Sequence, residues 1–126
     1  MSIESIHTPN APEALGPYSQ GVKFGNFIFL SMQIGLDPAS QELVTGGVLN
    51  QAHQVFKNLS AVLEEAGSSL DQVVKATVFL KNMGDFKGVN EIYNQYFTKP
   101  YPARAAVAVK ELPKNCDIGI EVTAIG

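Results

Sequence analysis

The chain has 126 residues, of which 45% are hydrophobic and 17% are charged, and its formal net charge is −3. This length predicts one domain that buries its core without disulfides or a structural metal. The single cysteine, Cys116, excludes an intramolecular disulfide and a thiolate-rich metal site. The mild acidity disfavours broad nucleic-acid binding through phosphates. No apolar run reaches the roughly 18 residues of a membrane span, and the first residues lack the pattern of a signal peptide, so we expect a cytoplasmic protein.

The first part of the chain predicts a short strand, a loop and a hairpin. Residues 3–6 favour a strand, and residues 10–21 (NAPEALGPYSQG) mix turn-forming residues with large side chains, which is typical of an ordered loop. Two β-prone runs, 22–24 and 27–31, flank Gly25-Asn26, a pair that favours a tight turn. We therefore expect an antiparallel hairpin directly after the loop.

The rest of the chain alternates helices and strands. Apolar residues recur at steps of three and four from 48 to 66, which predicts a long helix that ends at Gly67. Residues 73–80 (VVKATVFL) are β-branched and predict a strand, and residues 84–97 predict a second helix. Two final strands are expected at residues 104–109 and 118–125.

This order of elements predicts a two-layer α+β domain, in which a mixed sheet carries two helices on one face. The opposite face of such a sheet is too apolar to remain in water. Burial against another subunit is the expected solution, and the sequence therefore predicts a homo-oligomer.

Arg104 is the most informative polar residue, because it heads an apolar strand between alanines. A planar cation in that place needs a partner. It either forms an ion pair with a buried carboxylate of this chain or of a neighbour, or it binds the carboxylate of a ligand in a bidentate manner. Alternation along the strand puts Ala106 on the same face, which leaves space beside the guanidinium.

Glu121 is an acid on a largely apolar strand, where it shares one face with Gly119 and Thr123. Two roles are open to it. It pairs with Arg104 in a structural contact, which is the favoured interpretation, or it holds a water molecule as a general base.

Several other polar residues are weaker candidates on chemistry alone. Tyr18 and Ser31 supply hydroxyls at predicted loop and strand ends, and Asn90 falls on the apolar side of the second helix, where its amide needs partners. The two histidines, His7 and His53, lack the spacing of metal ligands, and no metal site is expected. The glycine pattern matches no phosphate loop or dinucleotide motif.

Taken together, five motifs resemble the RidA/YjgF/YER057c family of reactive-intermediate deaminases over nearly the whole chain. They are Gly16-Pro17-Tyr18-Ser19-Gln20-Gly21, Ser31-Met32-Gln33-Ile34, Val89-Asn90-Glu91-Ile92-Tyr93, Pro102-Ala103-Arg104 and Leu112-Pro113-Lys114. The resemblance implies a chorismate-mutase-like subunit and a homotrimer with clefts between neighbouring subunits. It also implies hydrolysis of 2-imino acids such as 2-iminobutanoate and 2-iminopropanoate, or of their enamine tautomers, to 2-oxo acids and ammonia, without a cofactor. Arg104 would bind the substrate carboxylate, and Tyr18, Ser31 and Asn90 would line the cleft.

The sequence departs from this family at two cleft positions. Ala106 stands where members usually carry a cysteine, and Gly119 stands where they carry a glutamate that is thought to orient the attacking water. Glu121 lies two residues further on the same face of the strand, and we hypothesise that it partly replaces this glutamate. Met32 also adds bulk beside the cleft.

These departures leave alternatives to an active deaminase. The first is a member that binds 2-oxo acids or other small carboxylates in a sensing or regulatory role, with weak or no catalysis. The second is a ribonuclease or translation inhibitor, which the acidic balance disfavours.

Overall fold

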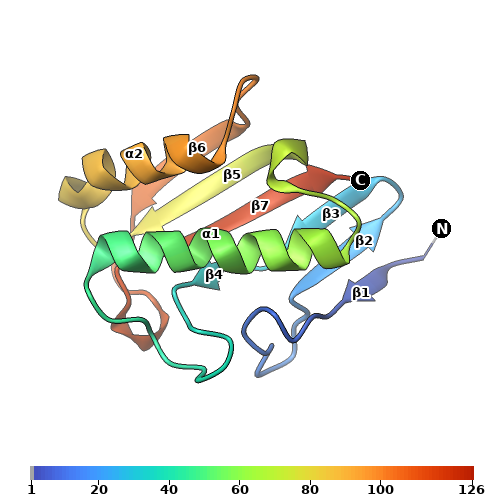
Figure 1. Cartoon of the computed structure of the whole chain (residues 1–126), viewed down its shortest axis with the longest axis horizontal. Helices are drawn as coiled ribbons and strands as arrows, with labels where there is room; N and C mark the ends of the chain where they lie inside the picture. Colours follow the sequence, from blue (N-terminus) through green and yellow to red (C-terminus); the bar gives the residue numbers. More distant parts are fainter. Residues whose placement is uncertain (1) are drawn as a thin grey trace.

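The structure is a computed structural model that describes residues 2–126, and it contains one mixed sheet and two long helices (Figure 1). The strands are β1 (Glu4–Ile6), β2 (Gly21–Phe24), β3 (Phe27–Leu30), β4 (Gln33–Ile34), β5 (Val73–Leu80), β6 (Ala103–Ala108) and β7 (Ile118–Ile125). The helices are α1 (Val48–Glu65) and α2 (Phe86–Tyr96). The strand order is β1-β2-β3-β7-β5-β6, with β4 paired to β7, and only the pairing of β5 with β6 is parallel.

Helix α1 confirms the helix predicted from the apolar period, and it supplies much of the core. Its buried face includes Val55, Phe56, Leu59, Val62 and Leu63, all fully inaccessible to solvent. Gly67 follows the helix with φ 81°, a left-handed conformation that costs glycine little. Burial of these side chains rather than capping stabilises α1, since its N-cap makes no side-chain hydrogen bond.

Helix α2 is shorter than predicted. The sequence indicated a start near Gly84, but residues Met83–Asp85 form a single 3-10 turn and the α-helix begins at Phe86. The helix ends before Pro100 and Pro102, as expected.

The predicted strands are confirmed to within a few residues, and β5 and β7 have the predicted bounds. The hairpin is also confirmed, with Phe24 opposite Phe27 and Gly25 at φ 61°. One strand was not anticipated. Strand β4 has two residues, too few for a periodic pattern, and it forms because Gln33 and Ile34 pair with Ile120 and Gly119 of β7.

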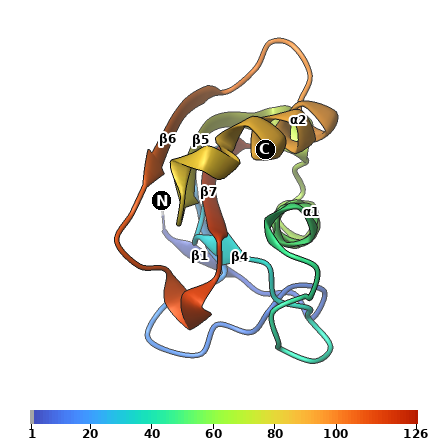
Figure 2. The same cartoon turned by 90° about the vertical axis from the view of Figure 1, so that its left-hand side faces the viewer.

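Both helices lie against the same face of the sheet, as predicted (Figure 2). The opposite, outer face exposes large apolar side chains, and residues 2–126 do not cover it. Phe27 and Phe29 of β3 are 50% and 45% exposed, Val107 of β6 is 43% exposed and Ile125 of β7 is 37% exposed. An apolar face of this extent on a small domain is typical of a protein interface. Within the described chain, neither helix has the length and apolarity that crossing a membrane requires.

Candidate functional site

Arg104 lies near the start of β6, which is an edge strand of the sheet. Its side chain points toward the helix-bearing face. Its partner on β5 is Ala76, which is fully buried under the helices. The guanidinium carbon lies 5.1 Å from the centre of the Phe86 ring and 4.7 Å from the centre of the Tyr93 ring. Arg104 Nη1 also donates a hydrogen bond of 2.6 Å to Asn90 Oδ1. Two cation–π contacts and one hydrogen bond therefore hold the guanidinium in place.

The three residues that hold Arg104 come from one face of α2. Phe86, Asn90 and Tyr93 are spaced at i, i+4 and i+7, so they follow one another along that face. Asn90 was predicted as a site residue, whereas no role in the site was predicted for Phe86 or Tyr93. Their spacing around Asn90 was a signal for the shared role, but it indicates an arginine partner only when the position of β6 is known.

A cavity of about 490 Å³ opens beside this cation, and its walls come from α2 and the chain before β6. They include Asn90, Asn94, Tyr101 and Arg104. Arg104 remains exposed, and no carboxylate of residues 2–126 forms an ion pair with it. Ala106 lies two residues further on the same face of β6, where it is half-buried and packs against the core. The guanidinium is thus supported on one side and makes no ion pair on the other, where Glu91 also lines the cavity.

Tyr93 is buried below the guanidinium, and its hydroxyl has no hydrogen-bond partner in the described part of the chain. Burial raises the pKa of this hydroxyl above its ordinary value near 10, and the charge of Arg104 lowers it by a smaller amount. The phenol therefore stays neutral at physiological pH, which suits a ring that packs against a cation.

The raised pKa of Tyr93 predicts a loss of stability at high pH. The unfolded chain loses the phenol proton from about pH 10, while the folded chain retains it, so the free energy of unfolding falls as pH rises above about 10. We expect Tyr93→Phe, which keeps the ring, to flatten this fall without destabilising the protein at pH 8. Urea unfolding from pH 8 to 11 measures both effects, with Tyr101→Phe as the control for an exposed hydroxyl. If the free energy of unfolding falls as steeply in Tyr93→Phe as in the wild type, the Tyr93 phenol is not its cause.

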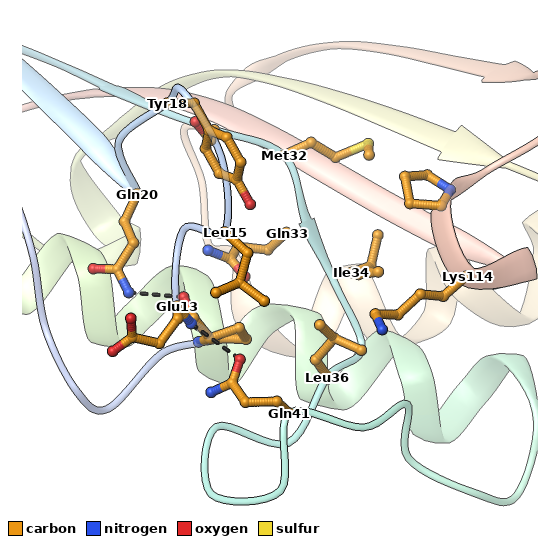
Figure 3. A pocket seen from close by; sticks show the side chains of 13 residues that line it. Glu13, Leu15, Tyr18, Gln20, Met32, Gln33, Ile34, Leu36, Gln41 and Lys114 are labelled. Atoms are coloured by element: carbon orange, nitrogen blue, oxygen red, sulfur yellow. Dashed lines mark hydrogen bonds between the residues drawn. The ribbon is translucent and has the colours of Figure 1, made fainter.

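A second cavity of about 490 Å³ lies at the loop before β2 and the segment around β4, and it contains Tyr18 and Ser31 (Figure 3). Ser31 donates a hydrogen bond of 2.6 Å from Oγ to the carbonyl of Ser19. Buried Gln20 holds the loop in shape, because its amide donates to the carbonyls of Thr8 and Pro12 at 3.0 and 2.8 Å. Gln20 Oε1 also accepts from the Thr8 amide at 2.7 Å. These contacts fix the segment that carries Tyr18.

Met32 lines this second cavity and lies directly over Gly119. A Cβ atom placed on Gly119 would lie 2.6 Å from Met32 Sδ and 3.0 Å from its Cγ. Such distances are well inside van der Waals contact, so any side chain at residue 119 would have to displace the methionine. The bulk that the sequence predicted beside the cleft therefore occupies the space above Gly119.

Glu121 is exposed on the outer face, where it lines a separate hollow of about 170 Å³ with Thr77, Thr123 and other residues. The face it shares with Gly119 and Thr123 is as predicted. The predicted pairing with Arg104 in one chain is wrong, because the two side chains point to opposite faces of the sheet. Glu121 is aligned with Thr77 of β5, whereas Arg104 is aligned with Ala76, the residue before Thr77. Because successive residues of a strand face opposite sides of the sheet, the two aligned side chains do so too.

Apart from Glu121, which lines its own hollow on the outer face, the predicted site residues form two groups on one chain. Arg104, Asn90 and Ala106 belong to β6 and α2, while Tyr18, Ser31 and Gly119 belong to the segments around the second cavity or next to Met32. The two cavities have no lining residue in common. Within residues 2–126, no group of three or more histidine, cysteine or acidic side chains is placed to hold a metal ion.

Comparison with known proteins gives the same family from sequence and from structure. The model of a family described as "Endoribonuclease L-PSP" matches residues 8–126. A RutC family protein of Pyrococcus horikoshii is 51% identical over 97% of this chain and 95% of its own length. A protein of Homo sapiens named 2-iminobutanoate/2-iminopropanoate deaminase is 51% identical over 95% of this chain and 88% of its own. The crystal structure of RidA from a Psychrobacter species is 46% identical, with a TM-score of 0.94 over 98% of this chain and 99% of that one.

Proposed function

Because the chain belongs to the RidA/YjgF/YER057c family and has its chorismate-mutase-like fold, we propose that it binds 2-imino and 2-oxo acids and hydrolyses the imines. The products would be a 2-oxo acid and ammonia. A relative that is 51% identical is named as a deaminase of 2-iminobutanoate and 2-iminopropanoate, while another is named only by its family.

The observation that carries this proposal is that Arg104 is held in place but has no carboxylate partner. Its guanidinium is held by two aromatic rings and an amide, and it has no carboxylate partner within the described chain. A guanidinium presents parallel N–H donors that match a carboxylate in a bidentate manner. A ligand with one carboxylate next to a reactive carbon satisfies this geometry and leaves that carbon beside the open cavity.

The second half of the cleft would come from another copy of the chain. Tyr18 and Ser31 line a cavity separate from that of Arg104, and the outer face between them carries exposed Phe27, Phe29 and Val107. Association through this face would bury the apolar side chains and bring the two groups together. We propose that three copies associate in this way and form three clefts.

In such a cleft the protein would form no covalent bond to the substrate and would act mainly by positioning it. Arg104 binds the carboxylate and positions the imine carbon. A water molecule adds to that carbon, and a proton moves to the nitrogen. In the resulting carbinolamine the hydroxyl proton also moves to the nitrogen as the carbon–nitrogen bond breaks, so that ammonia leaves and the carbonyl of the 2-oxo acid forms. The Tyr18 hydroxyl would donate a hydrogen bond to the reacting group from the opposite wall.

The proposal is tested by supplying the imine in solution. Threonine dehydratase generates 2-iminobutanoate from threonine, and we expect added protein to accelerate 2-oxobutanoate formation beyond spontaneous hydrolysis. Calorimetry with 2-oxobutanoate measures binding separately. The absence of both acceleration and binding would overturn the proposal.

A second candidate function is binding without efficient catalysis, in a sensing or regulatory role. It is favoured by Gly119, which offers no side chain to orient a water molecule and is covered by Met32. Binding of 2-oxobutanoate together with unaccelerated imine hydrolysis would select this candidate.

If Glu121 partly supplies the missing general base, its removal should lower turnover and leave binding intact. We expect Glu121→Gln, which keeps the size and removes the charge, to reduce imine hydrolysis about tenfold or more. Arg104 and Glu121 of one chain lie on opposite faces of the sheet, so they would act on one ligand only from two different copies. The affinity for 2-oxobutanoate should match that of the wild type, since Arg104 and not Glu121 would bind the carboxylate. Equal turnover in the two proteins would contradict the role of Glu121.

A further inference from the structure

We propose that Met32, placed over Gly119, makes the second cavity a pocket for the apolar side chain of the ligand, so that this protein prefers 2-imino and 2-oxo acids with larger uncharged side chains. This inference rests on the proposed function, since it assumes that the carboxylate binds Arg104. It further specifies which 2-imino and 2-oxo acids the cleft prefers.

The first observation is the fit between residues 32 and 119. Gly119 is buried on β7, and the Met32 side chain passes over it with Sδ where a Cβ would collide. Only glycine allows the thioether to lie flat against the strand. Methionine is unbranched and polarisable, and it adapts to apolar groups of different shape. The pair therefore places an adaptable apolar surface where a larger residue at 119 would place a side chain of its own.

The second observation is the remaining lining of the cavity. Figure 3 shows Leu15, Ile34 and Leu36 below Met32, with the ring of Tyr18 closing one side. The Ser31 hydroxyl is engaged with the carbonyl of Ser19, so it is less available to a ligand. A volume of about 490 Å³ is within the range of small-molecule sites and leaves room for more than a methyl or ethyl group.

The third observation concerns charge. The charged side chains at the rim are Glu13 and Lys114, which are both exposed and opposite in sign. They provide no net charge to attract a second ligand carboxylate. Burying such a carboxylate among apolar side chains would be costly without a paired cation. The pocket should therefore reject 2-oxo dicarboxylates and favour branched or unbranched apolar chains.

Calorimetry with a series of 2-oxo acids tests the preference in wild-type protein. From pyruvate to 2-oxobutanoate to 4-methyl-2-oxopentanoate, we expect the affinity to rise about fourfold for each added carbon that is buried. We expect 2-oxoglutarate to bind no better than pyruvate. Equal affinities across the apolar series, or tightest binding of 2-oxoglutarate, would overturn the inference.

Two variants test whether Met32 and Gly119 cause the preference. Met32→Gln keeps the length but adds a polar amide, and Gly119→Ala pushes the thioether away from β7 into the cavity. Each should lower the affinity for 4-methyl-2-oxopentanoate about tenfold and change that for pyruvate less than threefold. Gly84→Ala is the matched control, since a Cβ there meets nothing within 4 Å. Thermal unfolding confirms that each variant is folded.

The outcomes separate this inference from the function on which it rests. If all acids bind and Arg104→Ala abolishes binding, but both variants keep the wild-type order of affinities, then the role of Met32 is wrong and the carboxylate site stands. If Arg104→Ala binds every acid as the wild type does, the proposed function itself fails.

Discussion

Replacing Arg104 by lysine should weaken 2-oxobutanoate binding about thirtyfold, and replacing it by alanine should abolish binding at millimolar concentrations. Lysine keeps the positive charge but loses the planar fork that binds both carboxylate oxygens and the flat face that packs on Phe86 and Tyr93. Hydrogen bonds to charged groups contribute about 1.5–3 kcal/mol, which corresponds to losses of about one to two orders of magnitude in affinity. Calorimetry on the three proteins measures the series.

A loss of folding is not expected to confound this result. Arg104 is exposed, and cation–π contacts at exposed sites contribute only about 0.5–1 kcal/mol to stability. Lys110→Gln is the control for charge, because it removes an exposed cation shortly after β6. If Lys110→Gln weakens binding as much as Arg104→Lys, the ligand responds to overall charge and not to the fork of Arg104.

The sequence was most informative about elements whose side chains repeat with a regular period. The apolar steps of α1 and the alternation in β7 predicted these elements almost to the residue, and the alternation correctly placed Gly119 and Glu121 on one face. Strand β4 escaped because its two residues carry no period of their own. It depends on pairing with Ile120 and Gly119, which are more than eighty residues away in the chain.

Individual residues of the candidate site could be predicted from the sequence, but the contacts among them in space could not. Arg104 and Asn90 were each identified, yet their hydrogen bond depends on how β6 lies beneath α2. The incorrect pairing of Arg104 with Glu121 has the same origin. Alternation relates the faces of residues within one strand, but only the registers of β5 with β6 and β7 relate the faces of different strands.

The support of Arg104 extends into the core through Tyr93, and Phe56 of α1 is the next residue in this series of contacts. The Phe56 ring is fully buried and packs edge-on against Tyr93, with centroids 6.0 Å apart. It also stacks on Tyr96 at 4.5 Å and meets Phe97 edge-on at 5.7 Å. The core of the protein and the position of the candidate anion site therefore depend on one aromatic cluster.

Phe56→Ala should thus affect stability and binding together. Removing this ring leaves a cavity and should lower the free energy of unfolding by about 3–5 kcal/mol in urea titrations. Tyr93 then loses a packing partner, so we also expect several-fold weaker 2-oxobutanoate binding by the fraction that remains folded. Leu63→Ala, two turns further along α1, removes an equally buried side chain outside the aromatic cluster. It should cost about 2–5 kcal/mol and leave the affinity of the folded protein unchanged. If both variants bind as the wild type does, Tyr93 holds Arg104 without help from the core, whereas a loss of affinity confined to Phe56→Ala connects the aromatic cluster to the site.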